Sequence, residues 1–436
     1  MSGGIIGGDE VGAMVIDVGS YTTRAGYAGE DMPKADFPSY VGIIEEYADK
    51  VESMDISTNA TNGEIIKSSE AENKSNKKYY LDPLSLRTPK PHMQVQSYVK
   101  DGLIEDWDLF EKVLDYTFSK HLRCDPSNHP ILFTEPVMNP KQKREKLCEL
   151  IFEKYQAPGF YLSKNAVLSA FASSRTSGLV LDCGAVHTTA VPIHDGYVLN
   201  KAVAQSPLGG EFILTQSKQL LDEMNVELVP YYQVKSKETV KQNEPARFIR
   251  KEINDLTDSY KRFMLKETLL DFSTHVLQVS DSTYNEHEIS VLPRISYEFP
   301  NGYNTDFGEQ RFKIPEALFN RSFLKGVNQN ALLDVVHLIT SSINMCDAEL
   351  RSGFFSNIMV VGGNSLLIGF MDRLNYEFNH MNYKTKISAP PSAAERRFSS
   401  WVGGSILGSL GTFHQLWISK QEYEETGRVI VDKKCV

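Results

Sequence analysis

The sequence is poor in cysteine, and its few cysteines stand far apart. Its 436 residues include five, at positions 124, 148, 183, 346 and 435, and no two of them have the C-x-x-C spacing of a zinc site. An odd number of scattered cysteines also gives no disulfide framework and is typical of a protein that works in a reducing compartment. We therefore expect neither a structural zinc ion nor disulfide bonds.

Positive charge is scarce as well. The formal net charge is −10 at pH 7, from 46 lysines and arginines against 56 aspartates and glutamates. Proteins that grip DNA or RNA electrostatically carry an excess of Lys and Arg, so this balance excludes a broad contact with nucleic acid. Any association with nucleic acid is expected to go through a partner protein.

Long uninterrupted hydrophobic runs are also absent. Residues 352–371 carry no charge, but Asn357 and a Gly-Gly-Asn-Ser turn interrupt them, so a strand, a turn and a helix explain this stretch better than a membrane span. The first twenty residues contain Asp9, Glu10 and many glycines, which is unlike a secretory signal. Hydrophobic residues make up 41% of the chain, an ordinary value for a globular protein of two to three domains.

The most informative stretch is residues 14–29, MVIDVGSYTTRAGYAG. Its apolar start predicts a strand that ends at Asp17, a carboxylate that is costly to bury without a cation or several donors. Gly19 and Ser20 predict a turn with exposed amides before a second strand. A hairpin tip that carries amides, an acid and Arg24 suits a metal-bound phosphate, although an ordinary hairpin with a turn-forming Asp explains the motif better when it is taken by itself.

The same pattern recurs further along the chain. Residues 179–196, LVLDCGAVHTTAVPIHDG, again run from an apolar strand to an acid, Asp182, with Gly184 two residues later. A third turn, Val360–Ser365, follows a strand and is expected to open a helix over residues 365–378, so its backbone can lie flat against a base or ribose. Two hairpins that each end in an acid can bind one ligand from opposite sides. The repeat of the motif therefore indicates a phosphate site more strongly than one hairpin does.

Hydrophobic periodicity predicts strands that alternate with helices, and this indicates a layered α/β fold. Residues 30–42 are expected to form a loop-rich connector, and residues 44–78 a polar, solvated and mobile loop. The remaining expected elements are helices over residues 106–121, 165–173, 213–224, 248–269 and 332–345, strands over residues 129–134 and 357–361, and a hairpin at residues 301–302.

Capping residues mark two further helices. Asn139 and Pro140 are expected to begin a helix whose basic run, residues 141–146, forms a solvated face. A nuclear import signal or an anion-binding patch is the alternative interpretation of this run. Ser419 and Glu422 have the spacing of a capping box and predict a terminal helix.

These motifs together resemble actin and the actin-related proteins along nearly the whole chain. The matching segments are DVGSYTTRAGYAGED, NPKQKREKL, TSGLVLDCGAVHTTAVPIHDGY, VVGGNS and, most specifically, RRFSSWVGGSILGSLGTFHQLWISKQEYEE. Within the family, MSGGIIGGDEVGAMVIDVGS and QVSDSTYNEH look most like the actin-related protein 4 group, the nuclear actin-like subunit of chromatin-remodelling and histone-acetyltransferase complexes. The resemblance implies an actin-like α/β fold of two ribonuclease-H-like halves (four subdomains), with ATP and a divalent cation in the cleft.

The resemblance also implies how the chain is divided. A first half would span residues 1–165 and include the polar insert at residues 44–78. A second half would span residues 166–390 and include an appended lobe at residues 212–291. A C-terminal segment, residues 391–436, would pack back on the first half.

Carried over residue by residue, the resemblance implies a nucleotide site. Its residues would be Asp17, Gly19, Ser20, Tyr21 and Arg24 in the first phosphate loop, Asp182 and Gly184 in the second, Gly209, and Gly362, Gly363 and Asn364 in the adenosine loop, with Arg397 where the family has a base-stacking lysine. Asp17 and Asp182 would hold Mg²⁺ largely through water molecules.

Several positions depart from the pattern of actin. Tyr21 replaces a glycine and is expected to crowd the terminal phosphate. The second loop reads Asp-Cys-Gly-Ala-Val instead of D-S-G-D-G, Thr189 replaces a histidine, and Asn165 replaces the water-orienting glutamine. Loss of a positioned proton-handling group typically costs about 10² to 10⁴ in rate. We therefore predict that the protein holds ATP and hydrolyses it weakly or not at all, so it is not an enzyme.

The resemblance finally implies a nuclear scaffold subunit. Expected partners are actin, in a heterodimer, and a helical segment of a remodeller ATPase or an acetyltransferase scaffold. Contact with the nucleosome would be indirect, and no membrane contact is expected. We also expect no self-filament, because residues 44–78 differ from the loop with which actin docks into the next filament subunit. A groove would seat such a partner, unless its residues belong partly to the core; they are Phe171, Ala172, Tyr197, Leu407 and Leu410. The alternatives are an active ATPase or small-molecule kinase of the same superfold, a chaperone-type ATPase and a cytoskeletal actin relative.

Overall fold

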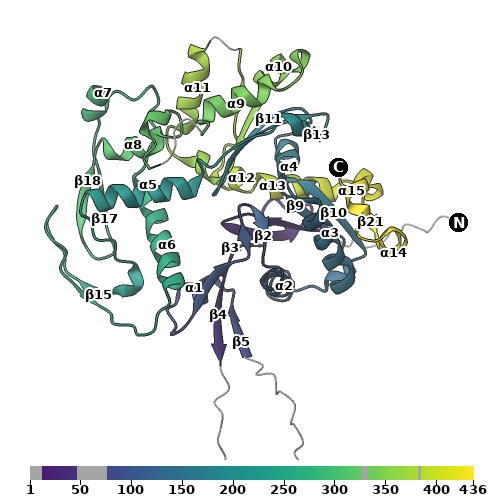
Figure 1. Cartoon of the computed structure of the whole chain (residues 1–436), viewed down its shortest axis with the longest axis horizontal. Helices are drawn as coiled ribbons and strands as arrows, with labels where there is room; N and C mark the ends of the chain where they lie inside the picture. Colours follow the sequence, from purple (N-terminus) through teal and green to yellow (C-terminus); the bar gives the residue numbers. More distant parts are fainter. Residues whose placement is uncertain (1–11, 47–75, 327–331, 382–383) are drawn as a thin grey trace, which may run out of the picture.

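The computed structural model of the chain describes residues 12–46, 76–326, 332–381 and 384–436. Within these residues two large sheets lie side by side with helices around them (Figure 1), as the alternating sequence pattern predicted. No helix in this part of the chain is both long and apolar enough to cross a membrane.

The first sheet has the strand order β21-β10-β9-β1-β2-β3. Its strands are β1 (Met14–Val18), β2 (Thr22–Tyr27), β3 (Ala35–Pro38), β9 (Ile131–Glu135), β10 (Gly159–Lys164) and β21 (Ile418–Ser419). Successive residues of β1 point to opposite faces of the sheet. Met14 and Ile16 pack in one core with α2 (Trp107–Tyr116) and α3 (Lys141–Glu149), and Val15 packs in another with Trp401.

The second sheet has the order β13-β12-β11-β19-β20, with β14 paired to β12. Its strands are β11 (Gly178–Cys183), β12 (Thr188–His194), β13 (Tyr197–Val198), β14 (Ala204–Ser206), β19 (Ile358–Val361) and β20 (Ile387–Ser388). Leu179 and Leu181 pack in the same core as residues of α9 (Val335–Asn344), whereas Val180 packs with α4 (Asn165–Ala172). Because Leu168 of α4 also packs with β1, this helix joins the cores of the two sheets.

Helix α13 (Ser399–Ser409) packs on α4 with almost no space between the two backbones. A Cβ atom at Gly403 would lie 1.8 Å from the carbonyl oxygen of Leu168, so only glycine permits this approach. The fully buried Trp401 donates from Nε1 to the carbonyl oxygen of Val15 at 3.0 Å. The Trp-Val-Gly-Gly sequence therefore anchors α13 to both α4 and the first sheet.

The end of the chain returns to the first sheet, where α15 (Ile430–Lys434) packs on α3 and β21 pairs with β10. The buried Arg144 of α3 donates to Glu135 at 3.0 Å, to Asp432 at 2.7 Å and also to the carbonyl oxygen of Cys435. The prediction that the basic run forms a solvated face is therefore wrong for Arg144, which holds the C-terminus in place.

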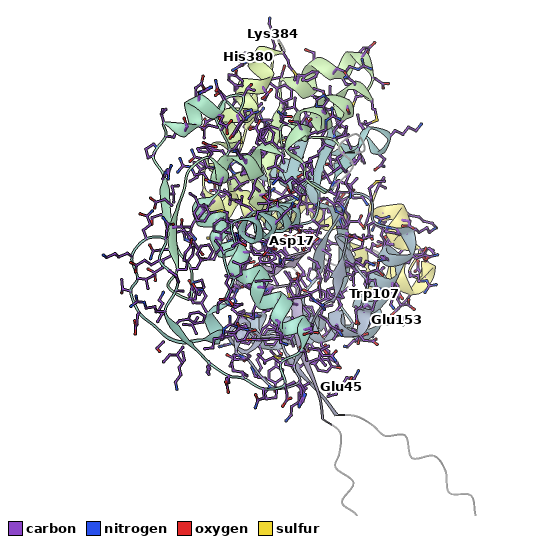
Figure 2. The ribbon with its side chains drawn as sticks, turned by 60° about the vertical axis from the view of Figure 1, so that its left-hand side comes forward. Asp17, Glu45, Trp107, Glu153, His380 and Lys384 are labelled. Carbon is purple, nitrogen blue, oxygen red and sulfur yellow. The ribbon has the colours of Figure 1, made fainter. Side chains whose placement is uncertain are left out.

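A smaller three-stranded sheet projects from the first half (Figure 1). It contains β4 (Tyr40–Glu46), β5 (Asn76–Tyr80) and β6 (Gln94–Ser97). In the chain, α1 (Pro83–Arg87) lies between β5 and β6, and β7 (Val99–Lys100) and β8 (Leu103–Ile104) lie between β6 and α2. Strands β3 and β4 occupy the stretch that we expected to be a loop-rich connector. Of the expected loop at residues 44–78, the two ends form paired strands, with Glu45 and Lys77 joined by a 3.1 Å ion pair, and the middle lies outside the described residues (Figure 2).

The second half carries its remaining helices and two hairpins around its sheet (Figure 1). They are α5 (Gly210–Glu223), β15 (Val234–Lys237), β16 (Phe248–Arg250), α6 (Asp258–Val276), α7 (Glu286–Ser290), β17 (Ile295–Glu298), β18 (Asn304–Phe307), α8 (Gln310–Glu316), α10 (Ala348–Phe355) and α11 (Phe370–His380). Residues of α5 and α6 share one core with the second sheet, so the stretch that we expected to be an appended lobe is continuous with that half.

Most sequence-predicted elements are present, and the largest displacements are at the starts of two helices. Helix α6 begins at Asp258 instead of residue 248, because the Thr257 side chain accepts from the Tyr260 amide and caps it. Helix α11 begins at Phe370, after a short 3₁₀ turn and Gly369 at a φ of 82°. Pro140 is itself the N-cap of α3, and the Asn139 side chain bonds to Glu135 instead. The capping box between Ser419 and Glu422 begins α14 (Lys420–Thr426) as expected, and α12 (Ala393–Arg397) has another.

Candidate functional site

A cavity of about 950 Å³ lies between the two large sheets. The ends of β1, β9, β11 and β19 meet there, and residues from α5, α6 and α12 complete its wall. Figure 2 shows Asp17 near the middle of the molecule, at the end of β1. Of the predicted nucleotide-site residues, all line this cavity except Gly209.

Asp17 is almost fully buried and is satisfied by neighbours from two strands. One carboxylate oxygen forms a 2.7 Å ion pair with Arg24, and the other accepts from Thr134 at 2.5 Å. The β1–β2 hairpin sets the first contact, because its register places Asp17 directly opposite Arg24. Parallel pairing of β1 with β9 brings Thr134 alongside. Arg24 therefore lies at the cavity, but its guanidinium is occupied by Asp17 and Thr22.

Asp182 has fewer partners. It ends β11, and the Asn165 amide donates to it at a long 3.5 Å. Burial, and secondly the negative charge of Asp17, raise the pKa of Asp182 to about 6, while Arg24 opposes the shift. Asp17 and Asp182 thus line one cavity from two different sheets.

The first turn, between β1 and β2, is held tightly by its own backbone. The Gly19 amide donates to the Thr22 carbonyl at 3.0 Å, and a Cβ atom at Gly19 would lie 2.9 Å from that oxygen. Ser20 and Tyr21 follow at the cavity wall. The Tyr21 hydroxyl donates to Glu267 of α6 at 2.6 Å, so its ring reaches across to the other half.

The second turn, between β11 and β12, is fastened to the start of α5. The Gly184 amide donates to the His187 carbonyl at 3.0 Å, and the Gly210 amide donates to the Gly184 carbonyl at 3.1 Å. Gly209 supports this turn from behind, because a Cβ atom there would lie 2.7 Å from the Val186 carbonyl carbon. His187 lines the cavity, and burial lowers its pKa, which keeps its ring neutral at pH 7.

The third turn follows β19 and lies against Asp182. Gly362 has a φ of 89°, and a Cβ atom there would lie 2.5 Å from the Asp182 carboxylate, so both its conformation and its position require glycine. Gly363 and Asn364 continue the wall. Arg397 lies at the rim, where its guanidinium pairs with Asp36 at 3.0 Å and lies over the Phe398 ring.

The cavity wall also contains polar residues that sequence reasoning missed. The position of Thr134 at the end of a strand parallel to β1 was a usable signal. The others come from elements whose approach to the cavity the sequence pattern does not indicate. The missed polar residues include Thr134, Glu135, His187, Gln205, Lys266 and Arg396.

The donor set fits a nucleotide with a divalent cation. Two facing carboxylates, one of them with few hydrogen-bond donors, are a hard oxygen site of the kind that Mg²⁺ prefers. Three turns place glycines at the cavity wall, and at Gly19 and Gly362 an added side chain would clash, so the bare backbone lets a bulky anion approach. Among the described residues no three His, Cys, Asp or Glu side chains are grouped to bind a metal directly, so water molecules would complete the coordination.

The positions that differ from actin have other partners here. The Asn165 side-chain oxygen accepts from the Ala166 amide at 2.8 Å, and its nitrogen is directed to Asp182. Thr189 lies on β12, directly opposite Asp182 in the register of the hairpin. Neither side chain provides a base that could take a proton from an attacking water molecule.

A second candidate surface is the predicted partner groove, which includes residues of α4, β13 and α13 and is only partly exposed. Phe171 and Leu407 pack at the edge of the core around Trp401. Tyr197 and Leu410 are 62% and 46% exposed. Ile406 and Leu416, which sequence reasoning missed, add two exposed apolar side chains, at 41% and 47%. The residues of this groove are therefore partly core and partly exposed, and its use as a partner site stays a prediction.

The comparisons with known proteins agree over almost the full length of the chain. The family model described as Actin matches residues 8–436. A protein of Arabidopsis thaliana named actin-related protein 4 is 40% identical, with 98% of this chain and 99% of the relative covered. Proteins of the same name from Oryza sativa subsp. indica (39%; 98% and 99% covered) and Schizosaccharomyces pombe (34%; 100% of both covered) are similar.

Proposed function

The chain belongs to the actin family, and from that premise we propose that it is a non-polymerising nuclear scaffold subunit that holds Mg-ATP in the cavity and hydrolyses it weakly or not at all. The single observation that carries this proposal is the convergence of Asp17 and Asp182, from two separate sheets, on one cavity. We also propose that the chain divides into two halves near residue 165, between β10 of the first sheet and β11 of the second.

In this proposal the chain's own residues bind and orient the nucleotide. Backbone amides of the turns at Gly19 and Gly184 would contact the phosphates, and Gly362 and Gly363 would lie against the ribose and base. The cation would supply positive charge between the phosphates and the two acids. Binding at one hundred times the dissociation constant would stabilise the fold by about 2.7 kcal/mol.

Weak hydrolysis follows from what the chain lacks at the phosphate end. With Asn165 bonded to backbone and Asp182, and Thr189 in place of a histidine, no side chain of the second turn is arranged as a proton acceptor for water except the neutral His187. If His187 does assume that role, the alternative of an active ATPase is correct. Replacing His187 by Gln distinguishes the two, because only an active enzyme would lose turnover.

The partner proposed for the second surface is an apolar helix, from a remodeller ATPase or an acetyltransferase scaffold, or actin itself. Tyr197, Ile406, Leu410 and Leu416 supply exposed apolar area around a rigid α4–α13 pair, which suits a helix laid in a groove. Their exposure in a protein of otherwise ordinary composition supports an interaction site.

The nucleotide proposal is tested by calorimetric titration of the purified protein with ATP and Mg²⁺. We expect saturable binding, strongly weakened by Asp17→Asn and unchanged by Asp31→Asn, an exposed carboxylate on the turn between β2 and β3. Phosphate release should remain near background. Absence of binding would refute the proposal, and turnover comparable to a working ATPase would favour the alternative.

The scaffold proposal is tested by affinity purification and mass spectrometry. We expect actin together with remodeller or acetyltransferase subunits, and loss of the helical partner in Leu410→Asp. Leu84→Asp, at a more exposed apolar residue on α1, should keep that partner. Cytoskeletal nucleators in the eluate, or pelleting of the pure protein with Mg-ATP and salt, would contradict it.

A further inference from the structure

A row of alternating charges crosses the first sheet beside the cavity. The strand register places Asp17 of β1 directly opposite Arg24 of β2, and Arg24 directly opposite Asp36 of β3. Side chains that lie directly opposite each other on neighbouring strands share one face of the sheet and interact. Arg24 accordingly pairs with Asp17 at 2.7 Å and with Asp36 at 3.5 Å. The row thus runs from the cavity to β3, the last strand in the order of this sheet.

Arg397 of α12 adds a fourth charge to this row. Its guanidinium donates to Asp36 at 3.0 Å, so the two carboxylate oxygens of Asp36 pair with two different arginines. The stem of Arg397 lies beside the third turn of the cavity, because a Cβ atom at Gly363 would lie 3.9 Å from its Cγ. The guanidinium groups of Arg24 and Arg397 also each lie 5.2 Å from the centroid of the buried Phe398 ring. Both arginines are therefore held between β3 and the junction of α12 with α13.

Asp36 differs from the other members of the charge row in its position. Asp17, Arg24 and Arg397 are part of the cavity wall, whereas Asp36 lies behind the two arginines and does not line the cavity. Its side chain is 28% exposed, so a substitution there does not open the core. Asp36 can therefore act on a bound ligand through its charge and through the two arginines that it holds.

The charge row is neutral as a whole, because two carboxylates balance two guanidinium groups. Guanidinium groups are good partners for phosphate oxygens. The terminal nitrogens of Arg24 donate to Asp17 and Thr22, and its Nε faces Asp36. Because Arg397 is paired with Asp36 as well, a phosphate in the cavity has to compete with Asp36 for both arginines.

We propose that Asp36 is a positioning residue that lowers the affinity of the cavity for highly charged nucleotides, because it holds Arg24 and Arg397 away from the phosphates. The inference rests on the proposed function, since it concerns the same nucleotide site. Electrostatic attraction grows with the charge of the ligand. Asp36 therefore weakens the binding of Mg-ATP more than that of Mg-ADP and leaves uncharged adenosine unaffected, so the wild-type site distinguishes the two nucleotides poorly by charge.

The proposal is tested first with Asp36→Asn, which keeps the shape and an acceptor oxygen but removes the negative charge. Calorimetric titration with Mg²⁺ present should show ATP binding about three- to fivefold more tightly than in the wild-type protein, and ADP about twofold more tightly. Adenosine should bind as before, whereas a merely structural effect would change all three affinities alike. Asp36→Glu should restore the wild-type affinities. The control Asp31→Asn removes an equal charge from the exposed turn before β3 and should change none of them.

A second comparison tests whether the gain depends on the released arginine. Arg397→Met is measured in the wild-type protein and in the Asp36→Asn background. We expect it to weaken ATP binding more in the second case, because Arg397 is then free to reach the nucleotide. A general effect of charge would give equal losses in both backgrounds. Equal losses, or equal gains for ATP, ADP and adenosine in Asp36→Asn, would overturn the proposal.

The same titrations separate this proposal from the proposed function. If ATP binds the wild-type protein and Asp36→Asn equally well, the role of Asp36 is wrong although the protein holds nucleotide. If ATP binds Asp36→Asn but not the wild-type protein, the role of Asp36 is supported and the proposed function is refuted. If ATP binds neither protein, the proposed function fails, and the role of Asp36 fails with it.

Discussion

Replacing Asp182 by Asn should stabilise the nucleotide-free protein at neutral pH. Burial and the facing charge of Asp17 raise the pKa of this carboxyl from an ordinary 3.8 to about 6. A difference of two pKa units corresponds to about 3 kcal/mol between the protonation states. Because water in the cavity screens part of this effect, we expect the substitution to recover about 1–2 kcal/mol.

The sign of the pH dependence follows from which state holds the proton more tightly. The folded protein keeps this proton until about pH 6, whereas the unfolded chain loses it near pH 3.8. The contribution of Asp182 to stability is therefore fully present below about pH 4 and is lost as the pH rises to about 6. The advantage of Asp182→Asn should be complete at pH 7.5 and shrink toward pH 5, where the carboxyl is largely neutral.

Mg-ATP should reverse the order of the two proteins. A cation beside the ionised carboxylate favours that form, so the wild-type protein gains about 2.7 kcal/mol at one hundred times its dissociation constant. Asp182→Asn lacks the charge and should gain much less. The measurement is the urea midpoint at pH 5 and pH 7.5, with and without Mg-ATP, with Asp31→Asn as the control. Lower stability of Asp182→Asn without nucleotide at pH 7.5, or an undiminished gain with Mg-ATP, would refute the reasoning.

The structure makes three further predictions, each measured by urea unfolding at pH 7.5. Arg373→Met should destabilise the protein by about 3–5 kcal/mol, because it leaves the fully buried Glu316, which pairs with Arg373 at 2.6 Å, without its cation. Gly403→Ala should cost about 1–3 kcal/mol or more, since the new methyl group forces α13 away from Leu168. Trp401→Phe removes the pyrrole part of the fully buried indole together with its bond to the Val15 carbonyl, which should cost at least about 1 kcal/mol. Wild-type midpoints would contradict each prediction.

Sequence reasoning succeeded where local chemistry repeats. The recurring strand, acid and glycine pattern located both Asp17 and Asp182 before any coordinates, and the structure brings the two acids to one cavity. The resemblance to actin-related proteins, and among them to the actin-related protein 4 group, is confirmed by the family model and by relatives of that name. The layered α/β class followed from periodicity alone and is also confirmed.

The sequence-based predictions are wrong where contacts between distant segments decide the local structure. Strands β3 and β4 were missed because the prolines of residues 30–42 suggested a loop, whereas pairing with β2 and β6 makes these residues extended. The helix expected from residue 248 begins ten residues later, because Phe248–Arg250 pairs with β15 instead. Arg144 was predicted to be a solvated cation because the sequence does not indicate that the C-terminal segment packs over it, where Asp432 accepts its hydrogen bond.

The cavity wall shows the same limit. The position of Tyr21 was marked from sequence as a departure from actin, but nothing in the chain indicated that its hydroxyl meets Glu267, 246 residues away. Arg397 was placed near the base, and its pairing with Asp36 of β3 was equally invisible. Long-range partners of this kind are set by how the halves dock, which no local pattern encodes.

The buried chain end has a practical consequence for labelling chemistry. Cys435 is next to last, yet it is buried against β10, and burial raises the pKa of its thiol to about 12. Cys148, Cys183 and Cys346 are buried too, and burial raises the pKa of the half-buried Cys124. Because maleimides react with exposed thiolates, the native protein should take up dye slowly at every cysteine. Single reporter cysteines can thus be introduced on either half without first removing the natural ones.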